Sequence, residues 1–231
     1  MPTGDLFPSV EQRLRAYHDL SDRARELVKK PAPPKPTITI TREFGCEAFP
    51  IAEELVKVAS KQTGERWILV DKSLLDALAR EHNIPESIMA SLGKKARWVE
   101  DMLNTLSHNW KGDADYYRLL CEQVVMTASV GNAVIVGLGA PIITKSMPNC
   151  HHFRLIGDHD FKVASIARRL KISKQDAEIM VLDRQKERDR IIKKLLDASE
   201  HEPLLYHAIF NNGKLKNKQI VKMIFDHVLN G

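Results

Sequence analysis

Short runs of β-branched and apolar residues alternate with longer helical patterns from residue 37 onward. The runs are TITIT (37–41), WILV (67–70), AVIVG (133–137), FRLI (153–156) and HAIF (207–210). Apolar residues at spacings of three and four predict helices over 51–62, 73–82, 85–108, 114–129, 159–170, 174–198 and 217–229. Strands that are separated by helices form βαβ units with parallel strands. The alternation therefore predicts a three-layer α/β domain around a mainly parallel five-stranded sheet.

Several predicted helices carry signals at their ends. Short polar side chains accept hydrogen bonds from the first helical amides, and glycine adopts the left-handed backbone that ends many helices. The predicted N-caps are Asp113, Asp158, Ser173 and Asn217, and the predicted C-terminal glycines are Gly64 and Gly131.

The first 36 residues are predicted to form a helical arm, followed by the main domain over 37–231. Over residues 9–30, Val10, Leu14, Tyr17, Leu20, Ala24, Leu27 and Val28 form one apolar stripe on a helix. The following PAPPKP segment (31–36) cannot continue this helix, because proline lacks an amide hydrogen. A contiguous apolar stripe needs a partner surface. We therefore expect the arm to pack on its own domain, on a second copy of the chain or on a protein partner.

Composition indicates which class of protein and which cellular compartment to expect. The 231 residues are 43% hydrophobic, which suffices for a buried core and rules out an intrinsically disordered chain. The odd number of cysteines, Cys46, Cys121 and Cys150, and the absence of a CxxC spacing argue against a disulfide framework. Neither the first residues nor the most apolar run, 133–143, resembles a secretion signal or a membrane span. We expect a cytoplasmic protein that does not bind membranes.

Positive charge is concentrated between Lys162 and Lys194. This segment holds eleven Lys or Arg against five Asp or Glu, whereas the whole chain has a net charge of only +5. Arg184 and Arg188 are four residues apart and share one face of a predicted helix. Such a face either binds an anion or is simply solvated. Nucleic-acid binding is a weaker interpretation, because the segment has no interleaved aromatic residues.

The loop after the first predicted strand has the layout of a phosphate site. In an open parallel sheet, ligands bind beyond the carboxyl ends of the strands. Here Arg42 is followed by Gly45, Cys46, Glu47 and Ala48, and then by the start of a helix. The free amides of a first helical turn can bind an anion. The alternative interpretation is a structural turn between strand and helix.

Other candidate residues follow later strands. Gly137 and Gly139 form either a second phosphate loop or an ordinary turn, and Asp71 either approaches a nucleotide or caps the helix that begins near Ser73. Cys150, His151, His152, His159 and Asp160 resemble metal ligands in type only. Because His151 and His152 are neighbours in a strand, their side chains point to opposite faces. The sequence therefore predicts no metal site there.

Short segments of the chain resemble the cytidylate kinase-like family in their order along the sequence. They are TITREFG, IAEEL, VDKSLL, GNAVIVGLGA, HHFRLIG, IARRLKIS, DRQKER and EPLLYHAIFNNGKL. The resemblance covers roughly residues 37–229. It implies the fold of a P-loop nucleoside monophosphate kinase, with ATP, Mg²⁺ and a nucleotide such as CMP as ligands. It also implies a lid near 162–198 that carries Arg184 and Arg188, and nucleotide contacts at Asp71, Gly137 and Gly139.

The chain departs from this family where phosphates bind. The family's loop usually reads REFGSGGREIA, whereas Cys46, Glu47, Ala48, Phe49 and Pro50 follow Gly45 here. Two glycines and a cation of the family's loop are thus replaced. The glycines let the backbone amides surround a phosphate, and the cation balances its charge. In the second segment, Leu138 stands where the family has an arginine. We therefore expect weak or absent phosphoryl transfer and assign no catalytic residue. The alternative is a non-catalytic regulator that binds a nucleotide or a protein.

Overall fold

The computed structural model describes residues 14–15, 17–19, 22–23, 34–74 and 113–229, and of 113–119 only the backbone. The predicted helix over 85–108 and most of the one over 73–82 lie outside the described residues.

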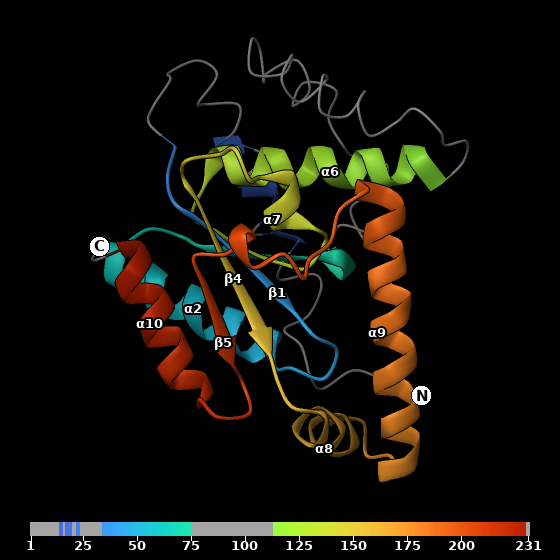
Figure 1. Cartoon of the computed structure of the whole chain (residues 1–231). Helices are drawn as coiled ribbons and strands as arrows, with labels where there is room; N and C mark the ends of the chain where they lie inside the picture. Colours follow the sequence, from blue (N-terminus) through green and yellow to red (C-terminus); the bar gives the residue numbers. More distant parts are fainter. Residues whose placement is uncertain (1–13, 16, 20–21, 24–33, 75–112, 230–231) are drawn as a thin grey trace.

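Five parallel strands form a single sheet in the order β2-β3-β1-β4-β5 (Figure 1). They are β1 (Thr37–Arg42), β2 (Ile68–Asp71), β3 (Ala133–Val136), β4 (Cys150–Ile156) and β5 (Ala208–Asn211). The predicted α/β class and all five predicted strands are confirmed. β4 begins three residues earlier than the FRLI run, because it pairs with β1 from Cys150 onward. Since β3 and β4 lie on opposite sides of β1, the carboxyl end of β1 is a switch point of the kind where such sheets bind ligands.

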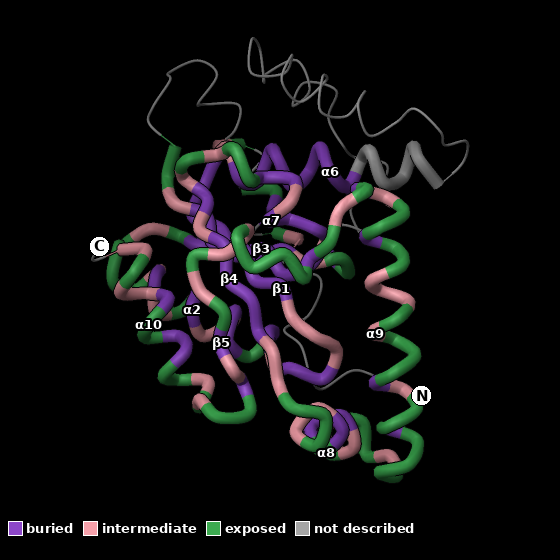
Figure 2. Tube along the Cα trace, in the orientation of Figure 1, coloured by how far each residue is buried: buried purple, intermediate pink, exposed green. Residues whose placement is uncertain are grey.

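Helices cover both faces of the sheet. One face packs against α2 (Ala48–Thr63) and α10 (Asn217–Leu229), and its core includes Ile40 of β1 and Phe153 of β4. The other face packs against α6 (Asp113–Val130), the short α7 (Ala140–Ile143) and the last turns of α9 (Lys174–Leu196). Figure 2 shows the buried residues concentrated in the sheet and in the inner sides of these helices. The layers therefore form two hydrophobic cores, one on each face.

α8 (His159–Leu170) lies beyond the carboxyl end of β4, and α9 runs from beside α8 along the sheet (Figure 1). Val163 and Ile166 of α8 pack against Ala177 and Val181 of α9 in a small core of their own. The pair covers the segment for which the family resemblance implies a lid. The sequence did not predict α7 or the 3₁₀ turn η1 (Pro203–Leu205), since elements of four and three residues are too short to show a periodicity.

Most of the predicted helix ends are confirmed. The side chains of Asp158 and Ser173 accept from the amides of Phe161 and Asp176, at 2.8 and 3.1 Å. Gly64 and Gly131 follow α2 and α6 with left-handed φ angles of 68° and 78°. The prediction for Asn217 is wrong, because this residue is the first of α10 rather than its cap, and its side chain bonds to Asn212 and Glu47. α6 is described only from Asp113 onward, so that cap stays a prediction.

The described part of the arm lies against the main domain. Tyr17 is only 3% exposed and packs in the core that α6 covers, and its hydroxyl donates to Gln123 Oε1. Arg66 pairs with Asp19, and Arg23 Nη1 donates to the Arg66 carbonyl at 3.1 Å. These residues show packing on the arm's own domain, while a second copy or a protein partner stays a prediction. Among the described helices, none combines the length and apolar character that a membrane crossing requires.

Candidate functional site

Three arginines from different elements lie near one another at the carboxyl end of the central strand β1. Arg42 ends β1, Arg154 belongs to β4, and Arg188 belongs to α9. Arg188 Nη1 donates to the Arg42 carbonyl at 2.6 Å, which brings α9 to the end of β1. Arg188 interacts electrostatically with both of the other guanidinium groups. The topology therefore gathers positive charge at the switch point of the sheet.

One buried carboxylate, that of Glu200, lies among these arginines. Glu200 is 6% exposed, and burial raises its pKa even though Arg188, Arg154 and Arg42 all act to lower it. Burial and the Arg188 charge lower the pKa of Arg42 to about 9, so Arg42 stays protonated at neutral pH. The three arginines outnumber Glu200 and the nearby Asp189, which also interacts with Arg188, so the cluster as a whole is positively charged. Such a cluster is suited to an anion.

The loop after β3 leaves room for Arg42. A β-carbon on Gly137 would lie 2.3 Å from Arg42 Nη1, so only glycine allows the guanidinium to come this close. Gly137, Leu138 and Gly139 have φ angles of 77°, 64° and 68°. Left-handed backbone is strained for a residue such as Leu138. The two predicted glycines thus shape the space beside Arg42, and Gly139 also precedes α7 as its N-cap.

Arg154 is the most enclosed of the three arginines. Only 3% of the residue is exposed, and its Nη1 is buried without a hydrogen-bond partner. Its Nη2 donates to His201 Nδ1 at 3.2 Å, and its guanidinium carbon lies 5.9 Å from the centre of the Tyr206 ring. A buried charged donor without an acceptor is costly. Arg154 Nη1 is therefore a position where a ligand oxygen would be stabilised.

The predicted phosphate loop is occupied by the protein's own side chains. The Phe44 amide donates to Gln185 Oε1, and the Glu47 amide donates to Asn212 Oδ1, both at 2.7 Å. The Cys46 amide donates to the Glu43 carbonyl at 3.1 Å. These amides do not point freely at a ligand, as a phosphate loop requires. In this state the segment has the hydrogen bonding of a structural turn.

Packing holds the rest of the loop. Gly45 has a φ of 103°, and a β-carbon there would lie 2.7 Å from Lys162 Cβ, so the loop touches α8. Burial, with a smaller effect from Glu43, raises the pKa of Cys46 to about 12, which makes this thiol a poor nucleophile. Ala48 is 2% exposed and packs in the core at the start of α2.

The carboxylates around the loop do not fit the ligand set of a magnesium ion. Glu43 pairs with Lys162 at 2.8 Å, and Glu47 accepts from Arg168, from Ser165 and from Asn217. Asp71 accepts from Ser73 Oγ at 2.9 Å and from the Leu74 amide at 3.0 Å, which is the capping role that the sequence offered as an alternative. Mg²⁺ binds through carboxylates and waters in an octahedron. Among the described residues, these three acids are instead held by cations or by backbone and side-chain donors.

The two arginines of the predicted lid lie in different surroundings. Arg188 is half-buried beside Arg42, whereas Arg184 pairs with Glu187 at 2.7 Å and has 59% of its side chain exposed. The structure therefore brings Arg188, but not Arg184, to the arginine cluster. The sequence missed Arg154 and Glu200 as site residues. A signal was present for Arg154, because an arginine is unusual within an apolar run such as FRLI.

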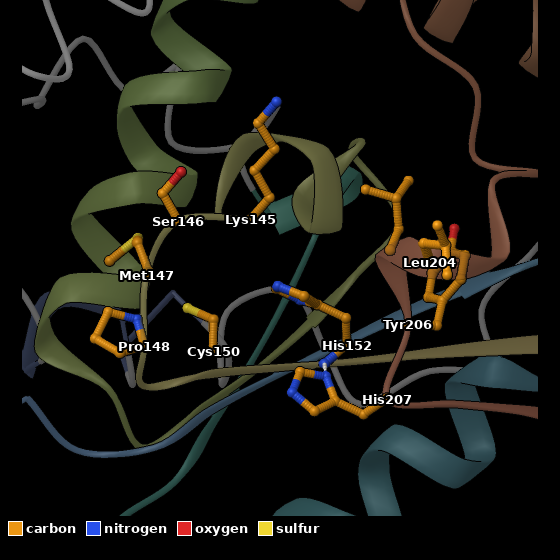
Figure 3. Close-up of a pocket in the computed structure, with 10 residues that line it drawn as sticks. Lys145, Ser146, Met147, Pro148, Cys150, His152, Leu204, Tyr206 and His207 are labelled. Carbon is orange, nitrogen blue, oxygen red and sulfur yellow. Dashed lines mark hydrogen bonds between the residues drawn. The ribbon is translucent and has the colours of Figure 1, made fainter.

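An open cavity of about 590 Å³ lies on the same side of the sheet as Arg154 (Figure 3). Its lining residues are Lys145, Ser146, Met147, Pro148, Cys150, His152, Leu204, Leu205, Tyr206 and His207. Tyr206 joins this cavity to the arginine cluster, since its ring lies beside Arg154 while its hydroxyl accepts from Thr41 and donates to the Glu200 carbonyl. A ligand at the arginines would thus lie next to a hollow with mixed polar and apolar walls.

Comparisons with known proteins identify a family and a fold. The model described as the cytidylate kinase-like family matches residues 37–214. A crystal structure of an uncharacterized protein from Eubacterium ventriosum ATCC 27560 has a TM-score of 0.66 and 18% identity, covering 85% of this chain and 99% of that chain. Shikimate kinase from Bacteroides thetaiotaomicron has a TM-score of 0.45 and 13% identity, covering 84% and 98%. No curated protein matches the sequence significantly.

Proposed function

Because this chain belongs to the cytidylate kinase-like family, we propose that it binds the phosphate of a nucleotide at Arg42, Arg154 and Arg188, with little or no phosphoryl transfer. The observation that carries this proposal is the buried Nη1 of Arg154, which has no hydrogen-bond partner. A phosphate oxygen would satisfy this donor.

The chemistry of the cluster favours a phosphate over a neutral ligand. A phosphate monoester carries a charge of about −1.5 to −2 at neutral pH, opposite in sign to the net charge of the cluster. Guanidinium groups bind phosphate oxygens in a planar, bidentate geometry. Burial strengthens such guanidinium–phosphate pairs, because the effective dielectric constant inside a protein is lower than in water.

Several features argue against efficient phosphoryl transfer. The reaction depends on backbone amides, cations and Mg²⁺ that hold the transferred group. Here Gln185 and Asn212 occupy two of the loop amides, and Glu47 places a carboxylate in the loop. In addition, Leu138 cannot make the phosphate contacts of an arginine. The alternative within the family is an active nucleoside monophosphate kinase that uses ATP and Mg²⁺.

The test compares two arginines of the same helix. We expect CMP, CDP or both to bind the purified full-length chain in calorimetry, and Arg188→Ala to weaken that binding by about ten- to hundredfold. This range follows from roughly 1.5–3 kcal/mol for a charge-assisted hydrogen bond. Arg184→Ala is the matched control and should bind as the wild type does. Arg154→Lys, which keeps the charge but loses the fork of donors, should also weaken binding.

Thermal unfolding separates the binding protein from the kinase. A ligand at a hundredfold excess over its Kd adds about 2.7 kcal/mol, or roughly 5 to 11 °C for a chain of this size. We expect such a shift with a monophosphate or diphosphate and almost none with ATP and Mg²⁺. A large shift with ATP, together with ADP formation that depends on CMP, would restore the kinase. Equal binding by the Arg188 and Arg184 variants would contradict the proposed site.

A further inference from the structure

Three histidines meet where β4 and β5 begin. His151 lies in β4, His207 directly precedes β5, and His227 lies in the last turn of α10. The centroids of the three rings are 5.4, 5.4 and 5.3 Å apart, so the rings form a nearly equilateral triangle. One ring nitrogen of each histidine lies within 4.8 Å of the other two. The cluster faces α10 and lies at the opposite ends of the strands from Arg42.

We propose that His151, His207 and His227 bind a divalent transition metal ion, represented here by Zn²⁺. Imidazole nitrogens are good ligands for Zn²⁺, and three of them form the protein part of one known type of catalytic zinc site. With Zn–N distances of about 2.0–2.1 Å, tetrahedral ligands lie roughly 3.4 Å apart. The ring nitrogens, now within 4.8 Å of one another, therefore need to approach by up to about 1.4 Å. His207 and His227 are exposed and can make this adjustment.

His151 has an unmet hydrogen-bonding need that a metal could satisfy. Its Nδ1 is buried and has no hydrogen-bond partner. The neighbouring His152 points to the other face of the sheet, where its Nδ1 is 2.8 Å from Thr39 Oγ1, so it does not take part in the cluster. The metal site thus combines His151 with two residues distant in sequence, and this is why the adjacent pair His151 and His152 did not reveal it.

The surroundings of the cluster favour a bound cation. His227 lies in the last turn of α10, where the helix dipole stabilises positive charge. Phe153 supplies an apolar floor, with its ring centroid 5.8 Å from that of His227 and 6.2 Å from that of His207.

One contact opposes metal binding and limits its strength. The His152 amide donates to His207 Nδ1 at 2.9 Å, which keeps the proton of neutral His207 on Nε2 (Figure 3). A metal must therefore displace that proton or turn the ring and break the contact. We expect an affinity below that of a closed structural zinc site. Three protein ligands also leave a fourth position for water or a small external ligand.

The test uses the full-length chain without an affinity tag, stripped of metal by a chelator. We expect titration with Co²⁺ to show one ion per chain with the strong visible bands of tetrahedral coordination, and Zn²⁺ to displace it. His227→Gln and His207→Gln should each weaken Co²⁺ binding at least tenfold. His159→Gln is the control, since His159 is an exposed histidine that pairs with Glu178 on another part of the surface.

Stability gives a second readout. Zn²⁺ would join α10 to the starts of β4 and β5, so it should raise the melting temperature of the wild type, and a chelator should reverse the rise. The same addition should leave the melting temperature of the His227→Gln variant unchanged. Absence of a bound ion, an octahedral Co²⁺ spectrum, or equal binding by the wild type and both cluster variants would overturn the proposal.

Discussion

Gly137 sets the position of the Arg42 guanidinium. Its backbone has a left-handed φ of 77°, and the space where a β-carbon would lie is taken by Arg42 Nη1 at 2.3 Å. A side chain here would therefore cause two separate effects. The strained backbone would lower the stability of the fold, and the displaced guanidinium would alter the arginine cluster.

Gly137→Ala should lower both stability and nucleotide affinity, whereas Gly64→Ala should lower stability alone. Gly64 is the matched control, because its φ is 68° and no atom lies within 4 Å of its added β-carbon. Left-handed strain costs about 1–2 kcal/mol in each variant, or roughly 2 to 8 °C in melting temperature. Calorimetric titration with the monophosphate measures the second effect. If both variants bind equally well, Gly137 does not position Arg42 for the ligand.

The site residues differ in how far the sequence could reveal them. Arg42 and Arg188 were predicted because each belongs to a recognisable segment, a loop after a strand and a basic helix. Arg154 and Glu200 were not, since their importance depends on which elements the fold brings together. The positions of Gln185 and Asn212 could not be predicted either, because each bonds to a loop amide more than 140 residues away in the chain.

The start of α8 shows how residues that are close in sequence determine where a helix begins. The Asp158 side chain accepts from the Phe161 amide, and Asp160 lies in the same first turn. Both features stabilise the amino-terminal end of a helix. Sequence predicted these boundaries well because the cap and the first turn are neighbours in the chain. It failed for the start of β4, which depends on pairing with β1 far away in sequence.

Asp158→Ala should lower the free energy of unfolding by about 1 kcal/mol, whereas Asp158→Asn should retain most of it. Asparagine can still accept from the Phe161 amide, so the comparison isolates the cap from the loss of charge. Urea unfolding of both variants provides the measurement. If alanine and asparagine prove equally harmful, then the charge of Asp158, rather than its capping bond, stabilises α8.

At the scale of the whole molecule, buried titratable groups make stability depend on pH. Burial lowers the pKa of His152 from 6.5 to about 4. Between pH 6.5 and about pH 4, His152 therefore binds a proton in the unfolded chain but not in the folded one. The stability of the fold falls as the pH drops through this range. Glu200 has the opposite effect on stability. Because its pKa is raised in the fold, the folded chain holds the proton more tightly than the unfolded chain, and the stability that this contributes is lost as the pH rises.

We expect the melting temperature to fall by several degrees between pH 7 and pH 4, and to fall less in the His152→Gln variant. Full protonation of His152 corresponds to a loss on the order of 3 kcal/mol. Glutamine can still bond to Thr39 but does not titrate. Thermal unfolding in buffers of constant ionic strength gives both profiles. Parallel profiles for the two proteins would show that His152 is not the group responsible.

The contacts of Glu47 bear on how laboratory selection for faster phosphoryl transfer would have to proceed in this chain. Replacing Glu47 by glycine would leave Arg168, Ser165 and Asn217 without the acceptor that they share. Gln185 and Asn212 would still occupy the loop amides. The residues that bond to the loop thus come from α8, from α9 and from the segment around the start of α10, so restoring the family's loop requires changes in four segments, the loop included. If the chain has the weak transfer that we propose, such coupling between distant positions favours libraries that vary all four segments together over libraries that vary the loop alone.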